Sequence, residues 1–263
     1  MKVTTKVKRI AIGLISVFIL VISWYLINRF SYSKELSFFP NPGDVDTTLT
    51  IGIIGDSWVA GGKLDTVLYN DLFSNGLSSV VISSGHPGAK TKLIYQNLFK
   101  EGKEEYSSKF IIEDKPEYCI IIAGVNDAAS QIGSNYYAHH MILMVKTLLH
   151  YEITPVIVSL PEFGIEESID DMNILSKTRN IISAKINNNG ELDNISTYRA
   201  VLENELISEK LVESVVLIDF DNVCPDYHKC PDLYANSSHL SKKGNETLCQ
   251  IITNELLRNI NKH

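Results

Sequence analysis

The stretch that decides the fold is Leu49-Thr50-Ile51-Gly52-Ile53-Ile54-Gly55-Asp56-Ser57-Trp58. Its first six residues form an apolar, largely β-branched run, which is typical of a strand buried on both faces. The Gly-Asp-Ser that follows turns into a helix, placing the Ser57 hydroxyl at the rim of the sheet and its N–H at a helix N-terminus. Asp-Ser before a helix is also ordinary capping chemistry, so this segment alone does not identify a nucleophile.

Apolar runs of the same kind recur downstream and alternate with amphipathic stretches. The expected strands are 49–54, 79–82, 118–123, 154–160 and 214–220, and the expected helices are 59–73, 91–100, 135–151, 195–206 and 241–260. This alternation predicts an α/β fold with a parallel sheet covered by helices. Residues 162–194 have the weakest pattern, and we interpret them as an insertion near the functional site.

The N-terminal segment has the properties of a membrane anchor. Ile10 to Ile27 is uncharged and spans roughly 27 Å as a helix, enough for the hydrocarbon core of a bilayer. More bases precede than follow it, which places the N-terminus in the cytoplasm. A cleaved signal peptide is the competing interpretation, but bulky residues end this run. We expect a cytoplasmic segment over 1–9, a transmembrane anchor over 10–28, a linker over 29–48 and an extracytoplasmic domain, periplasmic or at the cell surface, over 49–263.

The charge and cysteine content indicate which classes of partner and cofactor the chain is expected to bind. The chain has 24 Lys and Arg against 31 Asp and Glu, a net charge of −7, so no basic surface for nucleic acid is expected. Cys224 and Cys230 enclose a short polar loop that a disulfide could close in an oxidising compartment. Metal binding by these cysteines with His228 is the weaker alternative, and no metal or other cofactor is expected.

Three further blocks follow predicted strands or precede the last helix, where ligands gather in open parallel sheets. Gly88 lies in a glycine-containing turn after the second strand, and Asn126 lies in Gly-Val-Asn-Asp after the third. His239 stands immediately before the C-terminal helix. Each block has a plain structural explanation as a turn or a helix cap.

Taken together, the four blocks resemble those of the SGNH, or GDSL-like, hydrolase superfamily, and the resemblance covers roughly residues 49 to 260. It implies a three-layer, flavodoxin-like fold with a five-stranded parallel sheet. It also implies Ser57 as nucleophile, His239 as base, and an oxyanion hole formed by the Ser57 and Gly88 N–H groups and the Asn126 side chain.

One position departs from that pattern: Asn236 stands where the family has an aspartate three residues before the histidine. An Asn can accept the His239 Nδ1–H but cannot neutralise an imidazolium. Three explanations remain open. A Ser57–His239 dyad suffices, another carboxylate such as Asp232 or Asp226 replaces the aspartate, or catalysis has been lost.

The leading functional hypothesis is a membrane-anchored, outward-facing esterase that removes acyl groups, acetyl first among them, from a carbohydrate or envelope glycan. The alternative is an O-acetyltransferase acting on a cell-surface polysaccharide, for which an acyl-donating membrane protein would be a candidate partner. A non-catalytic glycan-binding or assembly protein is the third hypothesis, and Asn236 is its main support.

Overall fold

The computed structural model describes residues 5–38, 49–101 and 107–261. The chain divides into two compact units, one ending at Ser33 and the other beginning at Lys34. Parts of three expected segments lie outside the described residues: positions 1–4 of the cytoplasmic segment, 39–48 of the linker and 262–263 of the domain. The expected domain boundaries therefore stay predictions.

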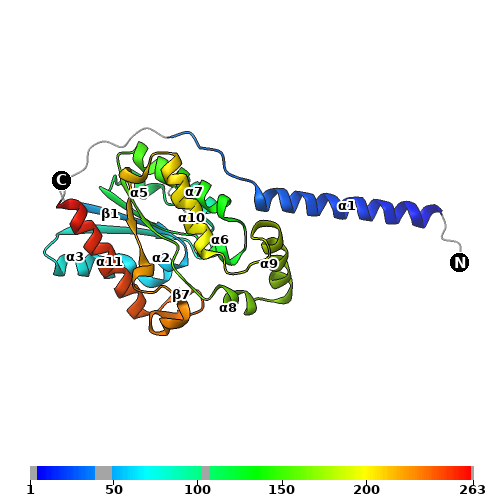
Figure 1. Ribbon diagram of the computed structural model, residues 1–263. Coiled ribbons are helices and arrows are strands. Elements are labelled where there is room, and N and C mark those ends of the chain that lie inside the picture. The colour runs from blue at the N-terminus through cyan, green and yellow to red at the C-terminus, as the bar shows by residue number, and fades with distance from the viewer. Residues whose placement is uncertain (1–4, 39–48, 102–106, 262–263) are drawn as a thin grey trace. The chain divides into compact units, whose positions relative to one another are not determined.

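The first unit contains the helix α1, Thr5–Phe30 (Figure 1). Its span Ile10–Phe30 has a mean hydropathy of 2.6, and none of the span is buried within the chain. By length and composition this helix can cross a membrane, and a signal sequence near an N-terminus has the same properties. The helix is as the sequence predicts, while its membrane role is taken up as a proposal below.

The second unit is built on a five-stranded parallel sheet, which confirms the predicted fold class. The strands lie in the order β2-β1-β3-β4-β5, and every neighbouring pair is parallel. Their bounds are β1 Leu49–Gly55, β2 Ser79–Gly85, β3 Tyr118–Ile122, β4 Thr154–Val158 and β5 Val216–Ile218. All side chains of β3 are buried, because β3 lies at the centre of the sheet with helices on both faces.

Helices cover the sheet in two outer layers (Figure 1). On one face α3, Leu64–Ser74, packs against α11, Lys242–Ile260. On the other, α7, Ser134–His150, packs against α4, Thr91–Asn97, and α10, Ile195–Ser208. The shorter helices are α2 Ser57–Gly62, α5 Lys109–Glu113, α6 Val125–Ala129, α8 Ile165–Asp170 and α9 Ile174–Asn187. This strand order places the carboxyl ends of β1 and β3 side by side.

Three expected elements differ from the structure. The helix expected over 59–73 is split into α2 and α3 at Lys63, whose φ of 49° is left-handed, because Gly61 and Gly62 are poor helix formers. The strand expected over 214–220 is only Val216–Ile218, at the edge of the sheet. Residues 162–194, expected to be the least regular part, contain the helices α8 and α9.

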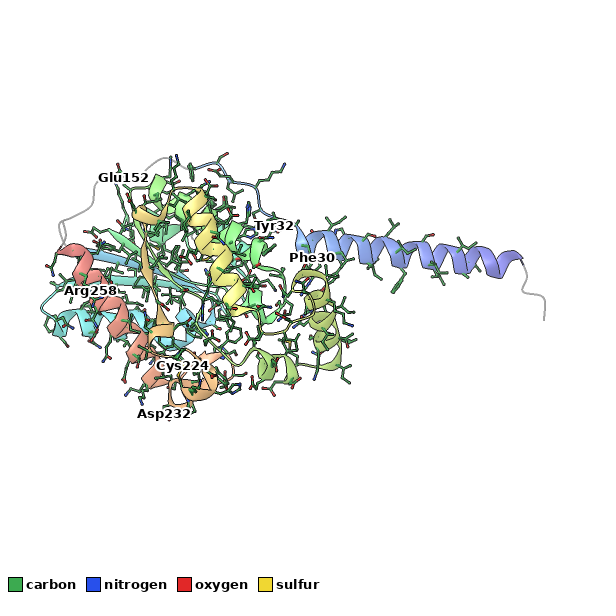
Figure 2. The ribbon with its side chains drawn as sticks, in the orientation of Figure 1. Phe30, Tyr32, Glu152, Cys224, Asp232 and Arg258 are labelled. Carbon is green, nitrogen blue, oxygen red and sulfur yellow. A yellow bond between two sulfur atoms is a disulfide. The ribbon has the colours of Figure 1, made fainter. Side chains whose placement is uncertain are left out.

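A small hairpin precedes the last helix. It pairs β6, Tyr234–Asn236, with β7, His239–Leu240, in an antiparallel arrangement. Just before it, Cys224 and Cys230 form a disulfide with a Cα–Cα distance of 5.9 Å, the favoured one of the two roles considered for these cysteines. Figure 2 marks Cys224 and Asp232 in this part of the domain.

Candidate active site

The structure brings the four sequence blocks together at the carboxyl end of the sheet. The Ser57 Oγ lies 3.0 Å from the His239 Nε2, although the two residues are 182 positions apart. A cavity of about 480 Å³ lies over them, and Gly88, Asn126 and Asn236 also line it. A hydroxyl within hydrogen-bond distance of an imidazole is the arrangement that activates a serine nucleophile.

The Ser57 side is held by close contact between β1 and its neighbours. A Cβ on Gly55 would lie 2.2 Å from the Ile122 carbonyl oxygen, so only glycine permits β1 to turn into α2 this near β3. Asp56 is fully buried and caps α2, because its carboxylate accepts a hydrogen bond from the Trp58 N–H at 3.0 Å. Ser57 is thereby fixed as the first residue of the helix.

The His239 ring is oriented by Asn236. The Asn236 Oδ1 lies 3.0 Å from the His239 Nδ1 and also accepts the Ser238 backbone N–H at 3.0 Å. A backbone N–H only donates, so the Asn236 atom that faces the imidazole must be the carbonyl oxygen. The Nδ1 then carries the hydrogen, which leaves Nε2 free to accept the Ser57 O–H.

The two carboxylates considered as substitutes lie elsewhere. Asp226 caps a short turn at His228 and pairs with Lys229, and Asp232 pairs with Lys243. Neither is among the hydrogen-bond partners of His239 within the described residues, where the Nδ1 contacts are Asn236 and, at 3.2 Å, the Ser238 Oγ. The geometry therefore disfavours a replacement carboxylate.

Trp58 links the two halves of the site, and the sequence did not single it out. Its indole Nε1–H donates to the Ser238 carbonyl oxygen at 2.7 Å, which ties α2 to the turn that carries His239. The ring is 3% exposed, so this hydrogen bond forms away from bulk water. A tryptophan next to a serine block gave no local signal of this role, because its partner is 180 positions away.

The expected oxyanion donors are placed in two different ways. The backbone N–H groups of Ser57 and Gly88 have no hydrogen-bond partner among the residues that the structure describes. Gly88 has a φ of 73°, a conformation that favours glycine. The Asn126 Nδ2 instead donates to the Asp56 Oδ2 at 3.3 Å and to the Ala89 carbonyl at 3.1 Å. Asn126 must release one of these contacts, or share it, to donate to a ligand.

Two buried carboxyl groups, those of Asp56 and Asp127, lie next to the turns that carry Ser57 and Asn126. Burial is the main cause that raises the pKa of Asp56 to about 7, and the neighbouring Asp127 adds to the effect. Burial also raises the pKa of Asp127 to about 6, although its carboxylate accepts two hydrogen bonds from Thr91. Asp127 therefore anchors the turn after β2 to the turn after β3, and Asp56 holds the Asn126 amide.

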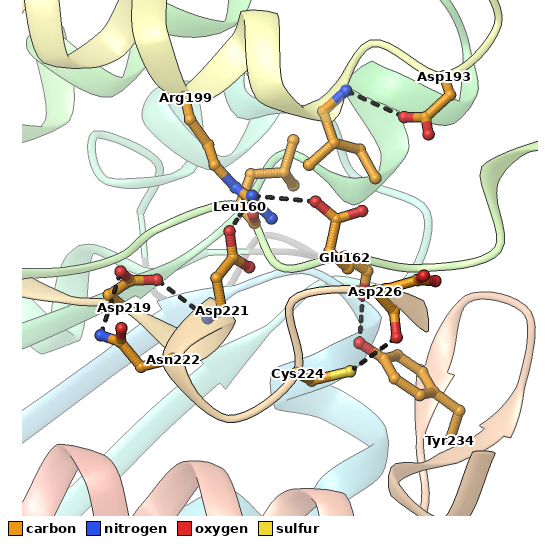
Figure 3. Close-up of polar contacts among 11 residues, drawn as sticks. Leu160, Glu162, Asp193, Arg199, Asp219, Asp221, Asn222, Cys224, Asp226 and Tyr234 are labelled. Atoms are coloured by element: carbon orange, nitrogen blue, oxygen red, sulfur yellow. Dashed lines mark hydrogen bonds and ion pairs between the residues drawn. The ribbon is translucent and has the colours of Figure 1, made fainter. Parts of the chain in front are cut away.

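An ion-pair cluster joins the ends of β4 and β5 to the hairpin (Figure 3). Arg199 of α10 contacts Glu162 at 3.0 Å and also pairs with Asp221, while its Nε donates to the Leu160 carbonyl. The Tyr234 hydroxyl at the start of β6 donates to the Glu162 carbonyl. Burial raises the pKa of Glu162 and Asp221, and the Arg199 guanidinium opposes that shift. The cluster fixes the hairpin that carries His239.

The predicted insertion contributes one wall of the cavity. Ser168 and Asp171, at the C-terminal end of α8, and Met172 line it together with Ser57 and His239. The sequence located this segment near the site but did not identify these residues. In the described part of the chain no group of three or more His, Cys, Asp or Glu side chains is placed to hold a metal ion.

Comparisons with solved structures show the fold. A lipase/acylhydrolase from Enterococcus faecalis aligns with a TM-score of 0.59 at 19% identity, covering 81% of this chain and 97% of that one. An acetyl xylan esterase aligns with a TM-score of 0.55 at 16% identity, covering 81% and 100%. A GDSL-like lipase from Bacteroides thetaiotaomicron aligns with a TM-score of 0.54 at 14% identity, covering 81% and 88%. The sequence matches no family model and no curated protein.

Proposed function

We propose that this chain, which has the fold of SGNH hydrolases, is a serine esterase that removes acyl groups through an acyl-enzyme on Ser57. The observation that carries the proposal is the 3.0 Å contact between the Ser57 Oγ and the His239 Nε2, with the Ser57 and Gly88 N–H groups unpaired beside it. A nucleophile, a base and two preorganised donors are the parts that ester cleavage requires.

The reaction follows from these positions. The Ser57 oxygen attacks the ester carbonyl while its hydrogen passes to the His239 Nε2. The carbonyl oxygen becomes an oxyanion that the two N–H groups stabilise, and one such donor is worth about 2.7–4 kcal/mol in a comparable hydrolase. The intermediate collapses, the alcohol leaves with the proton from Nε2, and a water molecule activated by the same nitrogen releases the acid.

A membrane-anchored enzyme acting on an acylated glycan is the finer form of the proposal. The hydropathy and length of α1 support an anchor, and its flanking bases support a cytoplasmic N-terminus with the domain outside. One structural neighbour is an acetyl xylan esterase, which supports an acetylated carbohydrate as substrate class. The serine and asparagine side chains among the lining residues suit a polyhydroxylated alcohol.

Labelling with a fluorophosphonate probe tests the nucleophile directly. The full chain in an uncharged detergent should be modified at Ser57, as mapped by mass spectrometry, and Ser57→Ala should abolish both labelling and 4-nitrophenyl acetate hydrolysis. Ser168→Ala is the matched control, because Ser168 lines the same cavity but its hydroxyl bonds the Ile165 carbonyl instead of a histidine. This variant should keep labelling and turnover.

The same detergent-solubilised chain distinguishes an esterase from an O-acetyltransferase and from a non-catalytic protein. Release of acetate to water identifies an esterase, whereas preferential transfer of the acetyl group to an added oligosaccharide identifies the O-acetyltransferase. An intact, folded chain with neither labelling nor turnover would overturn the enzyme assignment and favour a non-catalytic glycan-binding protein.

A further inference from the structure

The catalytic cavity is lined by a single acidic side chain. Of the thirteen described residues that line it, Asp171 is the only acidic one, His239 carries the only imidazole, and none is a lysine or arginine. The other lining residues are apolar, glycine, hydroxyl or amide residues. A lone charge in a cavity of otherwise neutral groups sets the sign of the electrostatic potential felt by a ligand.

The Asp171 carboxylate is available for such a contact. Asp171 is the C-cap residue of α8, and its backbone N–H donates to the Glu167 carbonyl at 3.0 Å. Its side chain is exposed and has no hydrogen-bond or ion-pair partner among the described residues, whereas the adjacent Asp170 pairs with Lys177. Asp170 does not line the cavity.

The surroundings add charge of the same sign. A second cavity, of about 250 Å³, is also lined by residues of α8. Five carboxylates border it, from Glu162, Glu166, Glu167, Asp193 and Asp226. Arg199 pairs with Glu162, Lys229 with Asp226 and the His228 imidazole with Glu167, so Glu166 and Asp193 carry the excess negative charge. Both Glu167 and Asp171 contribute to raising the pKa of the Tyr227 phenol, after burial, so their fields reach the same ring.

Resting on the proposed esterase function, we infer that Asp171 is a specificity-determining residue that favours esters with a cationic alcohol over neutral ones and disfavours anionic alcohols. An acetyl group fills a small part of a cavity of about 480 Å³, so the alcohol occupies the remaining space beside Asp171. The substrate class is therefore an acetylated sugar chain whose residues near the ester are neutral or carry free amino groups. Chains of uronic acids are disfavoured.

Two esters of the same shape test this inference. Acetylcholine and 3,3-dimethylbutyl acetate differ by one positive charge, so the ratio of their kcat/KM values isolates the charge preference. For the full chain in uncharged detergent at low salt, we expect a ratio about 1.5- to fivefold in favour of acetylcholine, the range of an exposed ion pair. Raising the ionic strength should reduce this ratio.

Variants identify the residue responsible. Asp171→Asn should bring the ratio close to that at high salt, and Asp171→Lys should reverse the preference. Asp170→Asn removes the same charge one position away and should keep the wild-type ratio, because Asp170 is paired outside the cavity.

The outcomes separate the two proposals. Ser57-dependent hydrolysis with a ratio that Asp171→Asn and Asp171→Lys leave unchanged would overturn the role of Asp171 alone. Ser57-dependent hydrolysis of 4-nitrophenyl acetate without hydrolysis of acetylcholine would likewise overturn the specificity inference alone. If Ser57 is not labelled and none of the three esters is hydrolysed in a Ser57-dependent manner, the proposed function fails and the specificity inference fails with it.

Discussion

The Oδ1 of Asn236 lies 3.0 Å from the Nδ1 of His239. In a serine protease, exchange of the corresponding aspartate for asparagine lowers turnover about 10⁴-fold because the amide favours the wrong imidazole tautomer. Here the Ser238 backbone N–H also donates to the Asn236 Oδ1, which prevents the amide from presenting its NH₂ group to the ring. The asparagine therefore selects the productive tautomer and lacks only the negative charge.

Asn236→Asp should raise kcat for 4-nitrophenyl acetate by at least about tenfold, because a carboxylate keeps both hydrogen bonds and stabilises the imidazolium that forms in the transition state. Steady-state kinetics measure the change. Asn236→Ala is the control and should lower kcat, since nothing else in the described structure fixes the tautomer as firmly. A lower kcat for Asn236→Asp would contradict the orienting role assigned to Asn236.

Trp58→Phe should lower kcat by about tenfold while KM changes little, because the ring still packs but no longer holds the Ser238 carbonyl and the turn to His239. The stability cost of one lost hydrogen bond is about 1 kcal/mol. Kinetics and thermal denaturation of the same sample separate the two effects. A kcat equal to that of the wild type would show that the turn is held without the indole.

Asp56→Asn should flatten the dependence of stability on pH. Asp56 keeps its proton in the folded protein up to about pH 7, whereas the unfolded chain releases it near pH 4. Between these values the folded state binds more protons, so the free energy of unfolding falls as pH rises through this window, by at most about 1.4 kcal/mol per pH unit for this group.

Urea denaturation at pH 5, 6, 7 and 8 measures that slope. In the Asp56→Asn variant the free energy of unfolding should depend less steeply on pH, because Asp56 no longer contributes a bound proton. The part of the slope that comes from Asp127 should persist. Identical slopes in the variant and the wild type would mean that Asp56 is ionised in the folded protein throughout.

Arg199→Met should destabilise the domain by roughly 2–4 kcal/mol, because Glu162 and Asp221 would face each other, partly buried, without a counter-ion. Their pKa values would rise further, so the loss should be larger at pH 8 than at pH 5. Lys177→Met, which breaks an exposed pair with Asp170, should cost no more than about 1 kcal/mol. Equal losses in the two variants would exclude a special role for the Arg199 cluster.

Much of the fold could be predicted from local patterns. The five strands and the longer helices α3, α7, α10 and α11 follow from apolar runs and their spacing, although Lys63 divides a helix that looked continuous. The short helices α5 and α6 and the helices α8 and α9 were not expected from the sequence. The edge strand β5 is shorter than its apolar run, since residues 214 and 220 belong to neighbouring 3-10 turns. The first and last residues of an edge strand depend on where the neighbouring strand pairs with it. A local sequence pattern carries no information about that pairing.

The sequence by itself determined the parallel sheet, the apolar N-terminal helix and the four blocks at the carboxyl ends, because hydrophobic periodicity and short motifs act over a few neighbouring residues. Only the tertiary structure decided how those blocks work together. Packing and hydrogen bonds made in the folded chain set the amide orientation of Asn236 and the link from Trp58 to Ser238. They also set the Arg199 cluster and the position of Asp171 at the wall of the cavity. Most of these contacts join residues far apart in the chain, so their pairing is set by the path of the backbone rather than by local sequence.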